Sequence, residues 1–332
     1  MKKAFYGYYR PSDDEFAELW ATARIVVDAN VLLAVYGLSP STRDVLLGLL
    51  DRVRDRVWIP SQFAFEYQRN RIGKIREQVK HYEDVHRSLQ AILEHNFRSK
   101  TQHPFVSEEV ERRLEEICTC LLEGKRQQES LLDVDPHFAR VTDIFADRVG
   151  PAYTEVELEK FYETARARFD KNIPPGFKDS QKPVPERYGD FVGWRQILDF
   201  ATKNRVSVIL VTDDAKEDWW RMEGTKNYGP RPELIVEFKN CCAGQFYMYS
   251  SDQFLEHSGR YIAGPVDPRA IIELKERRES ESPKEVAKAT IAPPSDQVIV
   301  KSAPPVSSTA DEAPAPDTPK LTAPVVEKPE AE

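Results

Sequence analysis

An apolar run interrupted by an acid most constrains the fold of this chain. Residues 24–33 read RIVVDANVLL, and Asp28 and Asn30 are the polar residues inside the run. A short apolar run of this kind is typical of a strand buried within a parallel sheet. Burying an unpaired carboxylate costs several kcal/mol or more. Asp28 therefore needs a hydrogen-bonding partner, a shifted pKa or a metal ion.

Further strand-like segments alternate with helical patterns along the chain. The strand-like segments are DRVWIPS at 55–61, VSVILVTDD at 206–214 and QFYMYS at 245–250. Helical patterns occupy 13–24, 39–55, 62–95, 106–132, 154–169, 191–205, 231–240 and 251–259. Ser12 or Asp13 is the expected N-cap of the first helix, and Ser61 that of the long helix at 62–95. The pattern predicts an α/β fold with a doubly wound, mainly parallel central sheet and a large all-α insertion.

Several acids fall where such a sheet brings distant segments together. Asp28 ends the first strand, and Asp213 and Asp214 end VSVILVTDD, so all three are expected at the carboxyl edge of the sheet. The full candidate set is Asp28, Glu66, Asp190, Asp213, Asp214 and Asp218. Taken singly, each acid also fits an ordinary role in a turn, a helix cap or a solvated helix surface.

A divalent cation would relieve the repulsion among these acids. Like charges in one cleft raise each other's pKa values, and a bound cation removes that cost. Mg²⁺ and Mn²⁺ prefer oxygen ligands, and two such ions about 3.5–4 Å apart can activate water and stabilise the leaving oxygen of a phosphodiester. The acids therefore predict a Mg²⁺ or Mn²⁺ site that hydrolyses phosphodiester bonds.

Four motif blocks resemble those of the PIN-like nucleases. The blocks are VVDANVLL, IPSQFAFEYQRNR, PPGFKDSQKPVPERYGDFVGWRQIL and VILVTDDAKEDWW, and the likeness spans roughly residues 18–256. Together and in this order they resemble a bacterial group with a large helical insertion. The resemblance implies a metal-dependent endonuclease, with RNA favoured over DNA as substrate, and it implies a toxin or phage-defence role.

The same resemblance assigns roles to single residues. It makes Asp28 the first metal ligand, and Glu66, Asp190 and Asp213 the acids that complete the catalytic set. Asp214 and Asp218 match further acids of the group, and which of the three late acids contacts metal stays open. Asn30 and Thr212 match polar positions beside the first and the later Asp.

Cations and aromatic rings near the acids are candidates for substrate binding. Those for phosphates or for the neighbourhood of the metal are Asn30, Arg69, Lys178, Lys182, Arg187, Thr212 and Lys216. Asp179 lies in the same proline-rich loop as Lys178 and Lys182. Phe177 and Tyr188 are expected to stack on unpaired bases. Trp194 and Trp219 stand on apolar faces and are expected in the core.

Composition sets the domain organisation. We expect a PIN-like domain at 1–260 with its helical insertion at about 72–171, a short helical or linker segment at 261–279, and a disordered, Pro-rich acidic tail at 280–332. The insertion is either a cap over the active site or a surface for a protein partner or a second copy. The net charge of −8 excludes a globally basic nucleic-acid binder, although a local basic groove is compatible with it. Four cysteines without zinc spacing and no run of about 18 apolar residues predict a cytoplasmic protein with no membrane span.

Two other functions compete with the nuclease. One is a catalytically silent PIN-like scaffold that binds protein or nucleic acid through the insertion. The other is a phosphatase of the haloacid dehalogenase type, which also has an Asp after its first strand. That family needs a second Asp two residues later, where this chain has Asn30.

Overall fold

A four-stranded parallel sheet is the centre of the fold. The computed structural model describes residues 1–97, 108–224 and 226–281. In spatial order the strands are β2 (Val57–Trp58), β1 (Arg24–Val27), β3 (Val208–Val211) and β6 (Phe246–Tyr249). The last residues of the three longer strands, Val27, Val211 and Tyr249, are paired in register. The residues that follow these strands therefore emerge at one edge, as the sequence predicts.

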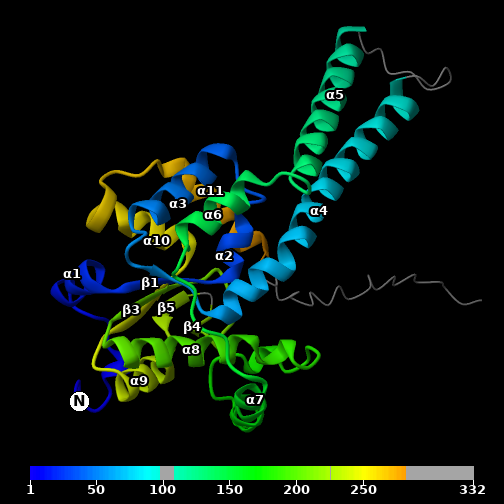
Figure 1. Ribbon diagram of the computed structural model, residues 1–332. Coiled ribbons are helices and arrows are strands. Elements are labelled where there is room, and N and C mark those ends of the chain that lie inside the picture. Colours follow the sequence, from blue (N-terminus) through cyan, green and yellow to red (C-terminus); the bar gives the residue numbers. More distant parts are fainter. Residues whose placement is uncertain (98–107, 225, 282–332) are drawn as a thin grey trace, which may run out of the picture. The chain divides into compact units, whose positions relative to one another are not determined.

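Helices cover both faces of the sheet, which confirms the predicted doubly wound α/β fold. Figure 1 shows α3 (Pro40–Arg52), α10 (Ser251–Ser258) and α11 (Pro268–Glu281) on one side, and α8 (Gly189–Asn204) and α9 (Pro232–Cys241) on the other. Every residue of β3 is buried, as are the last three of β1. Burial on both faces explains why these strands read as continuous apolar runs.

Helix starts follow the local sequence in most places. Helix α1 (Asp13–Thr22) begins with a capping box in which the Ser12 hydroxyl accepts from the Glu15 amide and the Glu15 carboxylate accepts from the Ser12 amide. Ser12 is thus confirmed as the cap. Helix α4 (Ser61–Ile92) differs from the prediction, because its N-cap is Pro60. The Ser61 hydroxyl instead donates to the carbonyl of Pro151 at 3.1 Å and ties the helix to the loop before α7.

Helices make up the insertion, as expected. The elements are the rest of α4 with η2 (Leu93–Phe97), α5 (Glu108–Ser130), α6 (Pro136–Ile144) and α7 (Glu155–Phe169). Helices α4 and α5 lie side by side (Figure 1), and Lys125 forms an ion pair with Glu83 at 2.8 Å across them. Within the described part of 66–171, strand-like pairing is limited to a bridge between Ile59 and Val149.

A buried polar network joins the insertion to the sheet domain. The Tyr36 hydroxyl, after α2 (Ala29–Ala34), donates to Asp135 at 2.7 Å and lies 3.1 Å from the Tyr67 hydroxyl on α4. Arg71 binds the same Asp135 carboxylate at 2.7 Å, and Asp135 also caps α6. Arg71 of α4 is therefore occupied by an ion pair within the protein.

A hairpin lies outside the sequence prediction, and a late helix falls in the segment 261–279 that was expected to be helical or a linker. Strands β4 (Trp220–Glu223) and β5 (Lys226–Pro230) form an antiparallel hairpin where no strand was expected. Helix α11 follows η5 (Gly259–Ala263) and packs on α10 and α3 with Ala270 and Leu274 buried. Short turns of helix, η1 (Tyr6–Tyr8), η3 (Phe177–Asp179) and η4 (Glu186–Tyr188), complete the described chain.

The predicted tail at 280–332 lies outside the described residues except for its first two positions. Among the helices that the structure describes, none combines the length and the apolar character needed to cross a membrane.

Candidate active site

Asp28 is held at the carboxyl edge of the sheet by two neutral donors. Its Oδ2 accepts from the Thr212 hydroxyl at 2.7 Å and from the Asn30 amide nitrogen at 2.8 Å. Only 7% of the residue is exposed. The pKa of Asp28 is raised to about 7, mainly by burial and also by the carboxylates of Glu66 and Asp214, against the opposing hydrogen bond from Thr212. Asp28 is therefore a buried acid without a cation of its own.

Asn30 and Thr212 connect the ends of β1 and β3. The Asn30 amide oxygen accepts from the backbone N–H of Asp213 at 3.1 Å. The Thr212 hydroxyl accepts from the backbone N–H of Asp214 at 3.1 Å and from the Asn30 side chain at 3.2 Å. Both residues were candidates for a role near the substrate, and the structure places them in the layer that fixes the acids.

Glu66 and Asp190 reach the same edge from two helices. The Gln62 side chain donates to Glu66 Oε1 at 2.7 Å, and the Trp219 indole N–H lies 3.4 Å from Asp190 Oδ2. Burial raises the pKa of both acids. Asp190 also lies within the electrostatic influence of Glu66 and Asp214. A Cβ at Gly189 would lie 2.4 Å from Glu66 Oε1, so any larger residue there would require the Glu66 carboxylate to move.

Lys216 supplies positive charge to this group of acids. Its ammonium lies 2.7 Å from Asp214 Oδ2, 3.0 Å from Asp179 Oδ1 and 3.5 Å from Asp190 Oδ2. Burial alone would lower the pKa of Lys216, but these three carboxylates raise it above its ordinary value. We call Asp28, Glu66, Asp179, Asp190, Asp214 and Lys216 the acid cluster.

The sequence did not reveal two parts of this arrangement. Asp179 was noted as a loop residue beside the edge, and it is one of the acids that bind Lys216. Lys216 was expected to face substrate phosphates. The sequence carries one signal for the position of Lys216. Asp often accepts from the backbone amide two residues later, in an Asx turn, and Asp214 Oδ1 accepts from the Lys216 amide at 2.9 Å.

Asp213 and Asp218 accept hydrogen bonds from backbone amides, and Asp218 stays within electrostatic reach of Asp214, Lys216 and Asp179. Asp213 Oδ1 accepts from the amide of Ser251 at 2.8 Å, at the start of α10. Burial raises the pKa of Asp213 to about 6, and its charged neighbours are Asp252 and Arg278. Asp218 Oδ2 accepts from the amides of Gly176 and Lys178, each at 3.0 Å. These contacts fix α10 and the proline-rich loop.

The predicted phosphate-binding cations stand around the rim, each with a contact of its own. Arg69 pairs with Glu186 at 3.1 Å, Lys182 with Asp179 at 2.6 Å, and Lys178 with Glu217. Arg187 donates to the carbonyl of Lys182 at 2.9 Å and lies over the Tyr188 ring. The pairs of Arg69 and Lys178 are exposed enough to exchange their carboxylates for phosphates at little cost.

The aromatic predictions divide in two. Trp194 and Trp219 are buried in the main core, which confirms their expected role. Tyr188 was expected to stack on bases, and that is wrong, because it is 5% exposed and stacks on Tyr162 at 5.1 Å. Phe177 stays half-buried with the Arg231 guanidinium 5.9 Å from its ring centre.

The donor chemistry of the cluster fits a hard divalent cation. Every acid in it offers carboxylate oxygens, and burial, the main cause of the raised pKa values of Asp28, Glu66 and Asp190, makes their charged forms costly unless a cation compensates them. Within residues 1–97, 108–224 and 226–281, however, no three His, Cys, Asp or Glu side chains converge closely enough to hold an ion. In this structure Lys216 contacts three of the acids, and Lys182 adds positive charge at Asp179.

A family model described as a PIN like domain matches residues 24–234 of the chain. The match begins at β1, ends in α9 and includes every residue of the acid cluster. It confirms the family expected from the four motif blocks. No curated protein and no solved structure matches the chain.

Proposed function

Because this chain belongs to the PIN-like domain family, whose members are generally nucleases, we propose that it is a metal-dependent endonuclease with RNA as its preferred substrate. The observation that carries the proposal is that Asp28, Glu66, Asp190 and Asp214 lie near one sheet edge, close enough for the charges of Glu66 and Asp214 to raise the pKa of Asp28 and of Asp190. Repulsion among neighbouring carboxylates lowers the stability of the folded protein. A divalent ion that binds them removes this repulsion, so the acids favour binding of the ion.

Asp28, Glu66, Asp190 and Asp214 are the residues that would hold Mg²⁺ or Mn²⁺. When bound, such an ion supplies an activated water and stabilises charge on the phosphate oxygens. Asn30 and Thr212 keep Asp28 oriented through its Oδ2, which leaves Oδ1 for the ion. Asp213 and Asp218 act as positioning residues, because they hold α10 and the proline-rich loop through backbone amides.

Lys216 has a double role in this proposal. It lowers repulsion among Asp179, Asp190 and Asp214 in the metal-free protein, and its ammonium stands where it can approach a substrate phosphate. Arg69, Lys178 and Lys182 at the rim orient the rest of the strand by exchanging their present carboxylate partners for phosphates.

The finer features rest on the motif resemblance and on two observations. We propose a cytoplasmic enzyme of the toxin or phage-defence type, and the free state of Cys118, Cys120, Cys241 and Cys242 supports a reducing compartment. The α4–α5 pair is proposed as the surface for a protein partner or a second copy, because much of α5 is exposed. The phosphatase alternative is disfavoured by Asn30, whose side chain donates to Asp28 and offers no acid.

The test uses labelled single-stranded RNA and DNA with Mg²⁺, Mn²⁺ or EDTA. We expect metal-dependent cleavage of RNA by the parent protein and none by Asp28→Asn or Asp214→Asn. Asp213→Asn is the matched control, because an amide at this position still accepts from the Ser251 amide. It should keep both cleavage and the rise in melting temperature that Mg²⁺ produces. Absence of cleavage together with absence of a Mg²⁺-induced rise would overturn the proposal and favour the scaffold.

A further inference from the structure

Exposed aromatic rings gather around the N-terminal turn η1 and the β4–β5 hairpin, on parts of the chain that the proposed mechanism leaves unused. Tyr8, in the N-terminal turn η1, is 57% exposed, and Tyr228, in β5, is 52% exposed. Phe5 and Tyr9 beside η1 are 54% and 41% exposed. Large rings are normally buried, so a group of exposed ones marks a binding surface.

Cations lie between these rings. The Arg221 guanidinium is 5.2 Å from the ring centre of Tyr8 and 5.7 Å from that of Tyr228, and the Lys226 ammonium is 5.0 Å from the latter. Neither cation forms an ion pair with any acid in the described chain, although Glu223 lies on the same hairpin. Stacked rings with interleaved cations match the bases and phosphates of an unpaired nucleic-acid strand.

The hairpin is attached directly to the segment that carries the acid cluster. The Trp220 indole, at the start of β4, donates to the carbonyl of Asp214 at 2.5 Å. Arg231, directly after β5, donates to the carbonyl of Glu217 at 3.1 Å and reaches over Phe177. Arg221 directly follows Trp220, and one strand residue spans about 3.3 Å. The backbone of Arg221 is therefore close to the residue whose side chain binds the Asp214 carbonyl.

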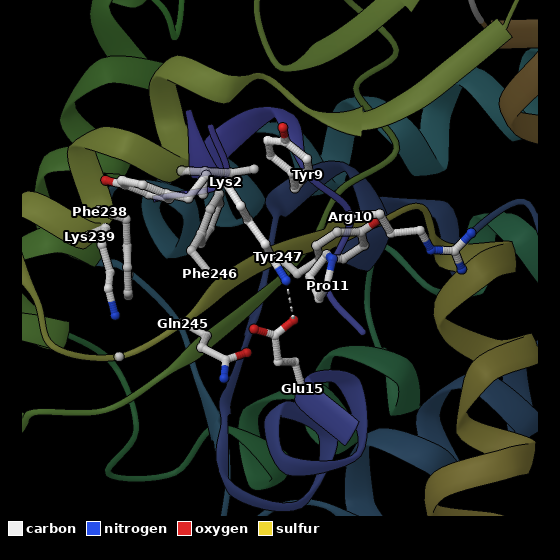
Figure 2. A pocket seen from close by; sticks show the side chains of 13 residues that line it. Lys2, Tyr9, Arg10, Pro11, Glu15, Phe238, Lys239, Gln245, Phe246 and Tyr247 are labelled. Carbon is white, nitrogen blue, oxygen red and sulfur yellow. Dashed lines mark ion pairs between the residues drawn. The ribbon is translucent and has the colours of Figure 1, made fainter. Parts of the chain in front are cut away.

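A cavity of about 230 Å³ lies between the N-terminal segment, α9 and the start of β6. Figure 2 shows Arg10 on one side of it and Lys239 on the other, with Tyr9 and Tyr247 among the rings that line it. Tyr247 also connects the cavity to the hairpin, because a Cβ at Gly229 of β5 would lie 3.2 Å from its hydroxyl. Rings and cations thus continue from the hairpin to this cavity.

We propose that η1 and the β4–β5 hairpin form a track that binds single-stranded nucleic acid and leads it to the acid cluster. The track rests on the proposed nuclease function and specifies its substrate class. Tyr8 and Tyr228 stack on successive unpaired bases, Arg221 and Lys226 contact the phosphates, and the cavity accommodates one further base. A duplex cannot use the track, because its bases already stack on each other.

The test measures binding without cleavage. Fluorescein-labelled strands of about twelve nucleotides, as RNA and as DNA, and the duplex of each are titrated with Asp28→Asn protein in EDTA, and anisotropy is recorded. In this background, Tyr8→Ala and Tyr228→Ala are compared with Tyr8→Phe and Tyr228→Phe, which keep a ring. Arg221→Gln is added at several salt concentrations.

We expect the single strand to bind at least about tenfold more tightly than the duplex, because only unpaired bases can stack. Each Ala variant should raise the Kd for the single strand about fivefold or more, while each Phe variant stays within about twofold. Arg221→Gln should flatten the salt dependence. Equal binding of strand and duplex, or Ala variants that bind like the parent, would overturn the track.

Cleavage by the same variants, made without Asp28→Asn, separates the two proposals. Metal-dependent cleavage by the parent that is unchanged in Tyr8→Ala and Tyr228→Ala means that the nuclease stands and the track is wrong. A parent that neither cleaves nor binds any strand overturns both.

Discussion

Replacing Asp28 by Asn tests the central physical claim, that the active-site acids are held in the protein at a cost. Asn has nearly the same shape, and its amide oxygen can still accept from Thr212 and Asn30, which are the two donors to Asp28 Oδ2. The substitution therefore removes a buried negative charge and keeps the hydrogen bonds from Thr212 and Asn30. In the absence of metal we expect the variant to be more stable than the parent near neutral pH.

The magnitude follows from the pKa of Asp28. Its value rises from 3.8 to about 7, with burial as the main cause. Each pH unit of difference corresponds to about 1.36 kcal/mol, so the cost of ionising Asp28 in the folded protein reaches about 4 kcal/mol above pH 7. Relaxation of the surroundings reduces this value, and we expect Asp28→Asn to raise the free energy of unfolding by about 1–4 kcal/mol at pH 8.

The sign of the pH dependence is fixed by the same values. Between pH 3.8 and about 7 the unfolded chain ionises Asp28 while the folded protein keeps it protonated. The folded state then binds more protons, so its stability falls as pH rises through this window. The advantage of Asp28→Asn should therefore be small at pH 5 and largest at pH 8.

Urea unfolding followed by tryptophan fluorescence, in EDTA at pH 5 and pH 8, measures both quantities. Asp133→Asn, at an exposed position of the insertion, is the matched control and should change little at either pH. Added Mg²⁺ should stabilise the parent and leave Asp28→Asn unaffected. The reasoning is refuted if the variant is no more stable than the parent at pH 8, or if the difference is the same at both pH values.

Three other substitutions test the rest of the site. Lys216→Met removes the cation among the acids and should lower the free energy of unfolding by about 3–5 kcal/mol in EDTA, with recovery on adding Mg²⁺; urea unfolding with and without the ion checks both. Asp218→Ala leaves two loop amides without their acceptor and should cost about 1–3 kcal/mol for each, whereas Asp218→Asn, measured alongside, should cost less because it keeps an oxygen. Gly189→Ala places a Cβ 2.4 Å from Glu66 Oε1, so Glu66 must move, and cleavage in Mg²⁺ should fall about tenfold or more while far-ultraviolet circular dichroism stays unchanged.

The strands and their common edge could be predicted because burial on both faces leaves a strong pattern. Residues 208–211 are all buried, and so are 25–27, which makes each run continuously apolar. The β4–β5 hairpin lacks that pattern, since the residues of β4 after Trp220 are exposed. Its sequence signal was Gly224, whose φ of +59° fits a turn between two short strands.

The choice between Asp213 and Asp214 could not come from the sequence. Side chains of adjacent residues in an extended segment point to opposite sides, so one acid of the pair has to face away from the cluster. Which one does so depends on the backbone amide of Ser251, which lies in a helix 38 positions further along the chain and donates to Asp213. Adjacent identical residues carry no local information about that distant amide.

Lys216 offsets part of the repulsion among the acids of the cluster. The cluster holds five carboxylates, Asp28, Glu66, Asp179, Asp190 and Asp214, and Lys216 contacts three of them. Asp28 and Glu66 have no such contact with Lys216. Asp28 avoids a buried negative charge by staying protonated up to about pH 7. Protons and a divalent cation therefore compete for the same oxygens. Lys216 neutralises the acids nearest the proline-rich loop. The carboxylates that remain for an ion are therefore those near Asp28, at the end of β1.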